Sequence, residues 1–319
     1  MTNFFGCDIS NDGKAENQFI DPKIALETFG IMTPKRSPYP LIRIGGSGDG
    51  AYLLPNDLSQ VGHCLSPGVN NFKHFEDELT TKFGIKCDMY DASSDVSQLT
   101  TPLIEGKQTF EKLWLDIDNK PDSISIKQWL ASKSPESGDC ILQMDIEGAE
   151  YRNLLATDSK DLARFRIIVI ELHKLASGFD RPTVFNKVIS PFFKKLDENF
   201  TCVHAHPNND DVMYTPKKLQ RAIPRILELT FLRKDRFTDK YSGSSPVSLP
   251  HPLDITNVMG KPPLHLGQEW MDSPRQLKSK ARMMNDWLEY YQHHYQAKNL
   301  GKLITAQAKY KVKKNLFNI

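Results

Sequence analysis

The chain has 319 residues, of which 39% are hydrophobic and 25% charged, enough to bury a substantial core. Its formal net charge of +2 at pH 7 excludes a strongly basic chain, so we expect no nucleic-acid partner. No apolar run approaches about 18 residues, and the first residues are polar and acidic, so we expect neither a membrane span nor a signal peptide.

The cysteines are odd in number and show neither a Cys-x-x-Cys motif nor a His/Cys spacing typical of zinc ligands. The five are Cys7, Cys64, Cys87, Cys140 and Cys202. Because most of them adjoin apolar runs, we predict buried free thiols instead of disulfides or a zinc site. Free thiols are typical of a reducing compartment, so we expect a cytoplasmic protein, with attachment to a membrane surface as a further expectation.

The N-terminal part is predicted to be an extension, residues 1–58. Up to about Pro38 the sequence shows no sustained hydrophobic period. Residues 41–44 and 51–54 then flank a glycine-rich turn, which predicts a β-hairpin.

From about residue 60, short apolar segments alternate with amphipathic ones, which is typical of βαβ units. The predicted strands cover residues 62–66, 86–90, 109–115, 140–144, 167–172, 200–204 and 225–232. The predicted helices cover residues 72–83, 125–132, 149–156 and 180–199, the last bending or breaking near Pro191. The fold class is therefore α/β, with a doubly wound, mostly parallel, seven-stranded Rossmann-like sheet in a main domain over 59–237.

After about residue 238 the sequence is rich in proline, serine and glycine, as in a linker or a segment that wraps the surface. Residues 238–319 are predicted to be this linker followed by basic amphipathic helices, starting at Ser273 and Pro274. The favoured prediction for the basic tail is a helix that packs its apolar stripe on the main domain and leaves its basic face to solvent. Contact with an anionic membrane surface or a partner enzyme is the alternative.

Ligands of a doubly wound sheet bind outside the carboxyl ends of its strands, near the point where the winding reverses. The first predicted strand leads into Gly68 and Asn70, where backbone N–H groups can bind an anionic group. The second strand ends at Asp91, whose carboxylate can accept hydrogen bonds from a ribose. The pattern indicates a nucleoside cofactor; an aspartate that caps the following turn is the alternative.

The most distinctive string follows the fourth strand. It reads Asp145-Ile146-Glu147-Gly148-Ala149-Glu150. This string resembles the hallmark of the FkbM-type sugar O-methyltransferases, an apolar strand that runs into Asp-(Ile/Val)-Glu-Gly-Ala-Glu, and the resemblance covers roughly residues 41–235. It implies a class I methyltransferase sheet with S-adenosylmethionine across the ends of the first two strands. Gly68 and Asn70 would then face the methionine part, and Asp91 the ribose.

The first loop departs from the family pattern. Ser66 and Phe72 stand where the family has an acidic residue and a second glycine. Arg43 of the hairpin is a candidate to bind the cofactor carboxylate; an ion pair with Glu147 or Glu150 is the alternative. Arg43 and Glu147 complete the predicted set of cofactor-binding residues.

Methyl transfer needs in-line placement of the acceptor and a route for its proton. The candidate catalytic residues at the same strand ends are Asp145, His173, His204 and His206. A histidine can accept a proton near neutral pH, and a structural, hydrogen-bonded histidine is the alternative for each. Asp145 and Glu171 are candidate ligands for Mg²⁺, which would orient and acidify a sugar diol. Stabilisation of the nearby carboxylates by a helix dipole, without a metal, is the alternative.

Three other functions compete with a methyltransferase. A nicotinamide oxidoreductase is disfavoured because the first loop lacks Gly-x-Gly-x-x-Gly. A glycosyltransferase is suggested by Asp116 and Asp118, which resemble a two-carboxylate metal motif, with a solvated loop as the alternative. A non-catalytic scaffold is suggested by Ser66 and Phe72. The favoured prediction is an O-methyltransferase that acts on a hydroxyl of a saccharide or glycan.

Overall fold

The computed structural model describes residues 3–10, 19–134, 138–217, 219, 221–238, 247–271 and 286. Except for Asp286, the predicted basic helices over 273–319 lie outside these residues. Within the described part, no helix is both long enough and apolar enough to cross a membrane.

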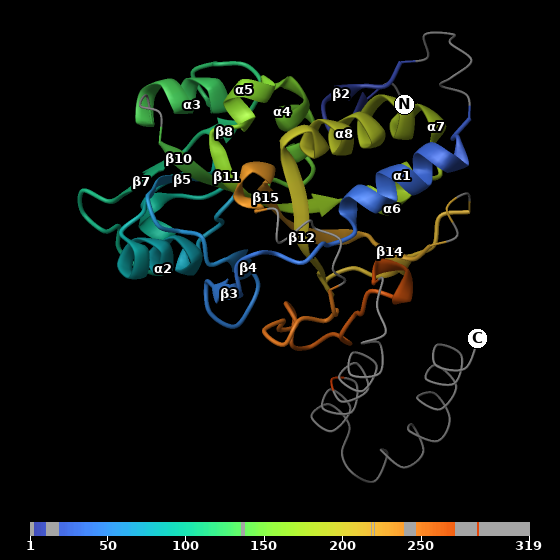
Figure 1. Ribbon diagram of the computed structural model, residues 1–319. Helices are drawn as coiled ribbons and strands as arrows, with labels where there is room; N and C mark the ends of the chain where they lie inside the picture. Colours follow the sequence, from blue (N-terminus) through green and yellow to red (C-terminus); the bar gives the residue numbers. More distant parts are fainter. Residues whose placement is uncertain are drawn as a thin grey trace.

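A seven-stranded sheet forms the centre of the molecule (Figure 1). In chain order its strands are β5 (Val61–Pro67), β6 (Lys86–Tyr90), β7 (Gln108–Glu111), β10 (Asp139–Met144), β11 (Phe165–His173), β12 (Phe200–Pro207) and β15 (Ile226–Arg233). Across the sheet the order is β12-β15-β11-β10-β5-β6-β7. All run in one direction except β15, which is antiparallel to both of its neighbours. The mostly parallel, seven-stranded α/β sheet is confirmed.

The central strands are apolar because both of their faces are covered. Every residue of β11 is buried, as expected of a strand between two layers of helices and loops. The predicted strand over 109–115 is wrong at its end, because β7 stops at Glu111. The following β8 (Trp114–Leu115) pairs instead with β9 (Ser123–Ile124) in a small separate sheet.

The winding of the chain reverses between β5 and β10. From β5 the chain moves outward to β6 and β7, then returns to β10 and continues the other way to β11. β5 and β10 are direct neighbours, with Leu65 opposite Leu142. The reversal point, where such sheets bind ligands, therefore lies between the carboxyl ends of these two strands.

Helices cover one face of the sheet, and a helix with a hairpin covers the other (Figure 1). The first layer contains α1 (Pro22–Met32), α3 (Ile126–Lys133), α4 (Glu150–Ala156) and α8 (Ser190–Asn199). The second contains α2 (His74–Phe83) and the hairpin of β3 (Leu41–Ile44) and β4 (Tyr52–Pro55). The hairpin was predicted correctly from its glycine-rich turn.

The extension before Pro38, for which no element was predicted, contains a helix. Helix α1 begins after the cap Asp21 with Pro22 at its start, a standard helix signal. Its buried side chains include Ala25, Phe29 and Met32, at helical spacing. The short strands β1 (Asn3–Phe4) and β2 (Cys7–Asp8) precede it.

The long predicted helix over 180–199 is divided into three segments. They are α7 (Pro182–Val184), a π-helical segment η3 (Phe185–Ile189) and α8. Pro191 lies at the start of α8 and cannot donate a backbone hydrogen bond. The wider π turn directly before it accounts for the irregularity expected near this proline.

The remaining short elements connect this framework. They are α5 (Ser159–Leu162), α6 (Leu175–Gly178), β13 (Met213–Tyr214), β14 (Ile223–Pro224), η2 (Val96–Gln98), η4 (Lys234–Arg236) and η5 (Gln268–Trp270).

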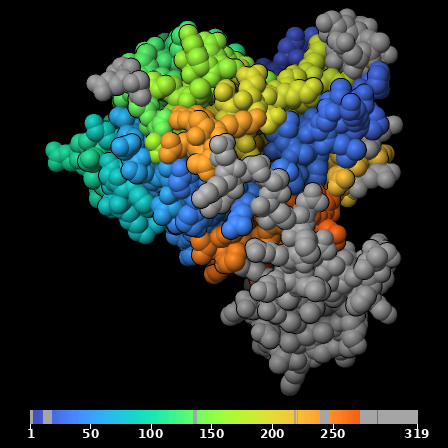
Figure 2. All heavy atoms as spheres, viewed as in Figure 1, coloured from blue at the N-terminus to red at the C-terminus, as the bar shows by residue number. Residues whose placement is uncertain are grey.

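Residues 247–271, here called the cover segment, pack on the main domain. Trp270 is 0% exposed, lies edge-to-face on Phe29 at 4.7 Å and donates its Nε1–H to the backbone oxygen of Ala222. In the space-filling view, orange residues of this segment lie against blue residues of the N-terminal part (Figure 2). Of the two alternatives for this region, the described part is a surface wrap.

Candidate active site

The predicted site residues gather at one edge of the sheet. Five parallel strands, β5, β6, β10, β11 and β12, end there, and the antiparallel β15 begins there. The hairpin and the cover segment approach the same edge from outside the sheet. The fold therefore brings together residues that are far apart in the sequence.

Gly68 makes close contact between two strand ends. Its φ is +82°, and a Cβ at this position would collide with the backbone oxygen of Asp145. Its N–H donates to the backbone oxygen of Tyr90 at 2.9 Å. Only glycine fits here, and the loop after β5 is fixed against both β6 and β10.

Asp91 holds the same loop from the other side. Its Oδ2 accepts the N–H of Asn70 at 2.7 Å, and its Oδ1 accepts the N–H and Oγ–H of Ser93 at 2.8 and 2.6 Å. Asn70 has a φ of +49°, a left-handed conformation that this hydrogen bond supports. The capping role foreseen as the alternative for Asp91 is thus present, and its carboxylate also fixes the geometry of the loop.

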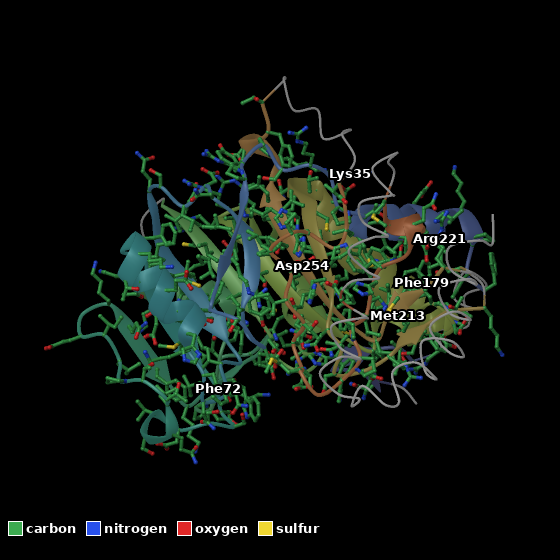
Figure 3. All side chains as sticks on the ribbon, turned by 90° about the horizontal axis from the view of Figure 1, so that it is seen from below. Lys35, Phe72, Phe179, Met213, Arg221 and Asp254 are labelled. Atoms are coloured by element: carbon green, nitrogen blue, oxygen red, sulfur yellow. The ribbon has the colours of Figure 1, made fainter. Side chains whose placement is uncertain are left out.

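A buried carboxyl group lies beside Ser66. The Ser66 hydroxyl contacts Glu76 of α2 and lies 2.7 Å from Oε1 of Gln143. Burial raises the pKa of Glu76 to about 7. Ser66 stands at the strand end where the family has an acidic residue. Here the carboxyl group beside that position is Glu76 of α2, and it is buried in the interior. The other departure from the family, Phe72, is 58% exposed beside the loop (Figure 3).

Arg43 is held by its own hairpin. Its guanidinium donates to the backbone oxygens of Gly46 and Gly48 at 2.6 and 3.2 Å. Burial lowers its pKa, opposed by the charges of Glu228 and Asp254. In the described part of the chain no ion pair links it to Glu147 or Glu150, so that alternative is wrong.

His173, at the end of β11, faces several carboxylates. Its Nε2 lies 3.3 Å from Oε2 of Glu147 and 3.5 Å from Oε1 of Glu171. The Tyr151 hydroxyl donates to its backbone oxygen at 3.0 Å, which fixes the strand end. Burial lowers the pKa of His173, so its imidazole is neutral at pH 7 and can accept a proton.

Two groups of potential metal ligands lie near His173. One contains Asp145, Glu147 and His173, and the other Asp49, Glu171 and Glu228. Asp145 and Glu171, predicted to share a Mg²⁺ ion, are thus divided between two groups. Burial, reinforced by the neighbouring carboxylates, raises the pKa values of Asp145 and Glu171 well above their usual range.

Two asparagine side chains connect the carboxylates of the second group. Asn208 donates to Asp49 and Glu171 at 3.2 and 3.1 Å. Asn257 of the cover segment donates to Asp49 and Glu228 at 3.1 and 2.5 Å. The result is a network of alternating amide and carboxylate groups, buried at Glu171 and Glu228 and exposed at Asp49.

His204 and His206, the other candidate bases, are both paired with Asp254. Nε2 of His204 lies 2.9 Å, and Nδ1 of His206 3.7 Å, from Oδ1 of Asp254. Burial acts to lower the pKa of His206, but the charge of Asp254 outweighs it and raises this pKa to about 9. His206 is therefore protonated near neutral pH when only protein groups surround it, and His173 is the better candidate base.

Sequence reasoning missed Asp49, Asp254 and Asn257. Asp49 was assigned to the glycine-rich turn and to the region of family resemblance but not to the site, and the other two belong to the proline-rich stretch. Figure 3 shows Asp254 near the middle of the view. No local pattern marks these residues, because their partners are distant in the sequence. The three-residue spacing of Asp254 and Asn257 is the only signal that could have suggested a common role.

The acidic pair that suggested a glycosyltransferase is engaged elsewhere. Asp116 accepts the Nε–H of Arg152 at 2.8 Å. Asp118 is exposed and forms an ion pair with Lys120 at 3.4 Å. The solvated loop foreseen as the alternative describes this segment better than a metal site does.

The sheet defines the class of the protein. Its last strand is inserted antiparallel between the fifth and the sixth, and the loops that contain Gly68 and Asp145 lie at the reversal point, as in the class I methyltransferase sheet that the resemblance implies. Residues 116–206 match the family model described as the methyltransferase FkbM domain, which confirms the resemblance. Together these findings support an S-adenosylmethionine-dependent methyltransferase. A comparison with curated protein sequences finds no match.

The chain was also compared with solved structures. Human N-acetylserotonin methyltransferase in complex with SAM is 12% identical, with a TM-score of 0.28 over 56% of this chain and 49% of that one. The plantazolicin methyltransferase BpumL in complex with SAH is 10% identical, with a TM-score of 0.26 over 54% and 76%. The O-methyltransferase NcsB1 from neocarzinostatin biosynthesis, in complex with S-adenosyl-L-homocysteine, is 13% identical, with a TM-score of 0.26 over 66% and 57%. The chain thus spans about half the length of the first of these proteins.

Proposed function

We propose that the protein transfers a methyl group from S-adenosylmethionine to a hydroxyl of a saccharide or glycan. One observation carries this proposal. The loop with Gly68 and Asn70 is fixed to Asp91 at the reversal point of a class I sheet, directly beside the string Asp145 to Glu150. Strand end, loop and acidic residue are the parts that a nucleoside cofactor requires.

In this proposal the cofactor lies across the ends of β5 and β6. The backbone around Gly68 and Asn70 approaches its methionine part, and Asp91 accepts hydrogen bonds from its ribose. Asp91 retains lone pairs for this purpose, because among the described residues its Oδ2 accepts one hydrogen bond, from the N–H of Asn70. The positively charged sulfonium would be attracted by the exposed carboxylate of Glu147, which lies beside the adjacent strand end.

The acceptor would lie between the sulfonium and His173. Its oxygen attacks the methyl carbon, the new C–O bond forms as the C–S bond breaks, and the sulfur leaves as a neutral thioether. The acceptor loses its proton to the imidazole of His173, which is neutral at pH 7. Glu147 lies beside Nε2 of His173, and its negative charge would stabilise the imidazolium that forms.

The amide and carboxylate network favours a polyhydroxylated acceptor. Asp49, Asn208 and Asn257 alternate as acceptors and donors, a pattern that matches sugar hydroxyls. Asp49, Glu171 and Glu228 offer only oxygen ligands, which is the donor set that Mg²⁺ prefers. They would hold Mg²⁺ in place of the predicted pair, and the ion would supply charge to orient and acidify the acceptor hydroxyl.

The location proposed for the protein is the cytoplasm. All five cysteines are free, and four of them are buried, which suits a reducing compartment. A glycan acceptor and, through the basic tail, a membrane surface or a partner enzyme complete the proposed set of partners.

Calorimetric titration of the purified chain with S-adenosylhomocysteine tests the cofactor class. UDP-sugar and NAD serve as parallel ligands. We expect binding of S-adenosylhomocysteine alone. Binding of UDP-sugar instead would favour a glycosyltransferase, and binding of none would favour the scaffold.

Asp91→Asn tests the cofactor site directly. It removes the charge but keeps the shape, and we expect S-adenosylhomocysteine to bind about 10- to 100-fold more weakly, because a charged hydrogen bond contributes about 1.5–3 kcal/mol. Asp95→Asn is the matched control, because Asp95 accepts the N–H and Oγ–H of Ser97 just as Asp91 accepts those of Ser93. Equal affinities of the two variants would contradict a ribose contact at Asp91.

A further inference from the structure

Three donor atoms from distant parts of the chain converge beside the proposed acceptor side. Nε2 of His204, Nδ1 of His206 and Oδ1 of Asp254 all lie within 4.8 Å of one another. The histidines alternate along β12, and the aspartate comes from the cover segment. All three side chains are buried, with 5%, 11% and 5% of their surface exposed.

The two ring nitrogens point at this common centre without a regular hydrogen bond. Nε2 of His204 and Nδ1 of His206 are buried and have no hydrogen-bond partner among the described residues, although both lie at ion-pair distance from Asp254. A buried imidazole nitrogen without an aligned partner is costly. A cation at the centre would bind both lone pairs and the carboxylate at once.

The other nitrogen of His206 is held in the way typical of a metal ligand. Its Nε2 lies 3.1 Å from Oδ1 of Asn257, while the amide nitrogen of Asn257 donates to Asp49 and Glu228. The orientation of this amide means that His206 donates through Nε2, so Nδ1 is the nitrogen directed at the centre. A metal ion that binds there would displace the proton on Nδ1 and take its lone pair. Such outer partners fix the tautomer and orientation of metal-bound histidines.

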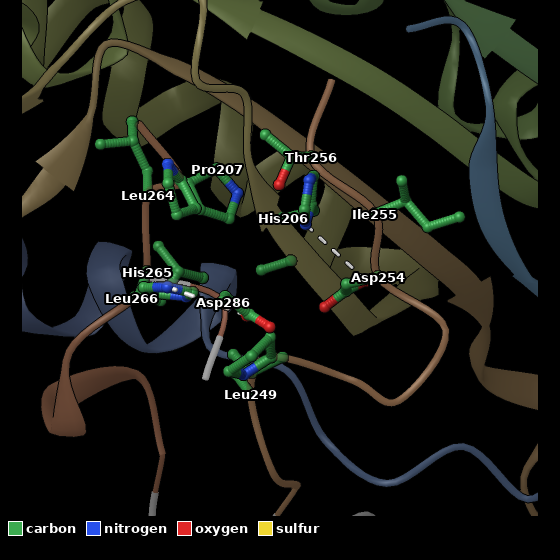
Figure 4. A pocket seen from close by; sticks show the side chains of 13 residues that line it. His206, Pro207, Leu249, Asp254, Ile255, Thr256, Leu264, His265, Leu266 and Asp286 are labelled. Carbon is green, nitrogen blue, oxygen red and sulfur yellow. Dashed lines mark ion pairs between the residues drawn. The ribbon is translucent and has the colours of Figure 1, made fainter. Parts of the chain in front are cut away.

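A small cavity adjoins the centre. It measures about 30 Å³, enough for a water molecule, and both His206 and Asp254 line it. Figure 4 shows the side chains of His206 and Asp254 directed toward each other, with Leu249, Leu264 and His265 around the cavity. A metal with three protein ligands would therefore have room for a water molecule as its fourth ligand.

We propose that His204, His206 and Asp254 form a zinc site. Two imidazoles and one carboxylate suit Zn²⁺, which takes nitrogen and oxygen ligands in tetrahedral geometry, and do not suit Mg²⁺, which prefers oxygen. The absence of a Cys/His zinc spacing in the sequence does not conflict with this site, because one ligand comes from the cover segment. The ion ties that segment, and with it Asn257, to the end of β12.

Zinc binding by the full chain tests the site. The protein is purified without a histidine tag, treated with a chelator and titrated with Zn²⁺, and bound zinc is measured by mass spectrometry. We expect one tightly bound zinc per chain that excess Mg²⁺ does not displace, and a rise in Tm on zinc binding. No bound zinc, or zinc displaced by Mg²⁺, would overturn the proposal.

Variants assign the ligands. We expect His206→Gln and Asp254→Asn to weaken zinc binding by about 100-fold or more, and Asn257→Ala by about 10- to 100-fold. His63→Gln is the matched control, because Nδ1 of His63 also faces a carboxylate, Asp88, at 3.6 Å but has no second histidine beside it. Unchanged zinc binding in the ligand variants would refute the site.

Cobalt gives a readout that does not depend on the folding of a variant. Co²⁺ bound to the unaltered chain should show the strong visible absorption of a tetrahedral site. The weak absorption typical of octahedral Co²⁺ would indicate that the ion binds to the carboxylates instead, and this result would contradict the proposal. The outcome is independent of cofactor binding, because none of these ligands is assigned to S-adenosylmethionine.

Discussion

His173 and His206 lie at the same edge of the sheet, but their surroundings shift their pKa values in opposite directions. Around His173 burial dominates and lowers the pKa, even though Glu147 lies 3.3 Å away. Around His206 the buried charge of Asp254 dominates and raises the pKa to about 9. Two histidines that look equivalent in the sequence therefore have different chemistry.

The role of His173 as a base predicts a pH dependence of the rate. The neutral imidazole is active, so kcat/KM should be level near pH 7 and fall as the pH drops through the His173 pKa, which is below 6.5. His173→Gln should lower kcat/KM by about 10²- to 10⁴-fold and remove this acid limb. The measurement is transfer of a labelled methyl group to acceptor sugars over pH 5–8.

His74→Gln provides the control for this experiment, since His74 lies at the start of α2. It should leave the acid limb in place. If kcat/KM of His173→Gln still falls at low pH, a group other than His173 accepts the proton of the acceptor hydroxyl.

Helix α2 illustrates how an element is attached through a buried polar group. Its Glu76 is inserted beside Ser66 and Gln143 in the interior, and burial raises its pKa to about 7. The folded state therefore favours protonated Glu76. This contribution to stability is complete below the unfolded pKa of 4.5 and is lost as the pH rises through about 7.

Replacing Glu76 by glutamine should remove this pH dependence. Relative to the unaltered chain, Glu76→Gln should be about equally stable at pH 5 and up to about 3 kcal/mol more stable at pH 8.5, by urea unfolding. Glu78→Gln, on the same helix, is the control, because hydrogen bonds from Lys82 and Gly45 lower the Glu78 pKa despite its partial burial. The effect of Glu78→Gln on the free energy of unfolding should be the same at pH 5 and at pH 8.5. A stability difference for Glu76→Gln that does not grow with pH would show that Glu76 is ionised in the folded chain.

Most elements of the sheet could be predicted because their signals are local. The centre of β10 follows from its apolar residues Cys140 to Leu142, and Gly68 and Asp91 follow from their places after strands. Helix α1 was missed although its cap and apolar spacing are in the sequence. Asp254 and Asn257 could not be predicted, because they join the site only through contacts with β12, β15 and the hairpin.

At the scale of the whole molecule, the cover segment is attached by Trp270. Its ring fills a fully buried position against Phe29 of α1, and its Nε1–H is bonded to Ala222. The same segment carries Asp254 and Asn257. A contact with the N-terminal helix thus helps to hold polar groups at the carboxyl edge of the sheet.

Trp270→Ala should loosen the cover segment while the sheet persists. Loss of a buried tryptophan lowers the free energy of unfolding by about 3–5 kcal/mol. We expect most of this loss to appear as easier local opening of the cover segment. Hydrogen exchange should accelerate over residues 247–271 and stay slow in β10 and β11. Trp114→Ala, at a position 52% exposed, should change neither region. Equal acceleration in the central strands would mean that the segment and the sheet unfold together.

The hydrogen bond from Asn257 to Asp49 also has a consequence for the order of synthesis. The loop with Gly68 and its partner Asp91 are both translated before the first third of the chain is complete. Asn257 leaves the ribosome only after the last strand of the sheet. A nascent chain can therefore form the hydrogen bond between Asn70 and Asp91 early, while its acidic edge remains uncovered until translation has passed residue 257.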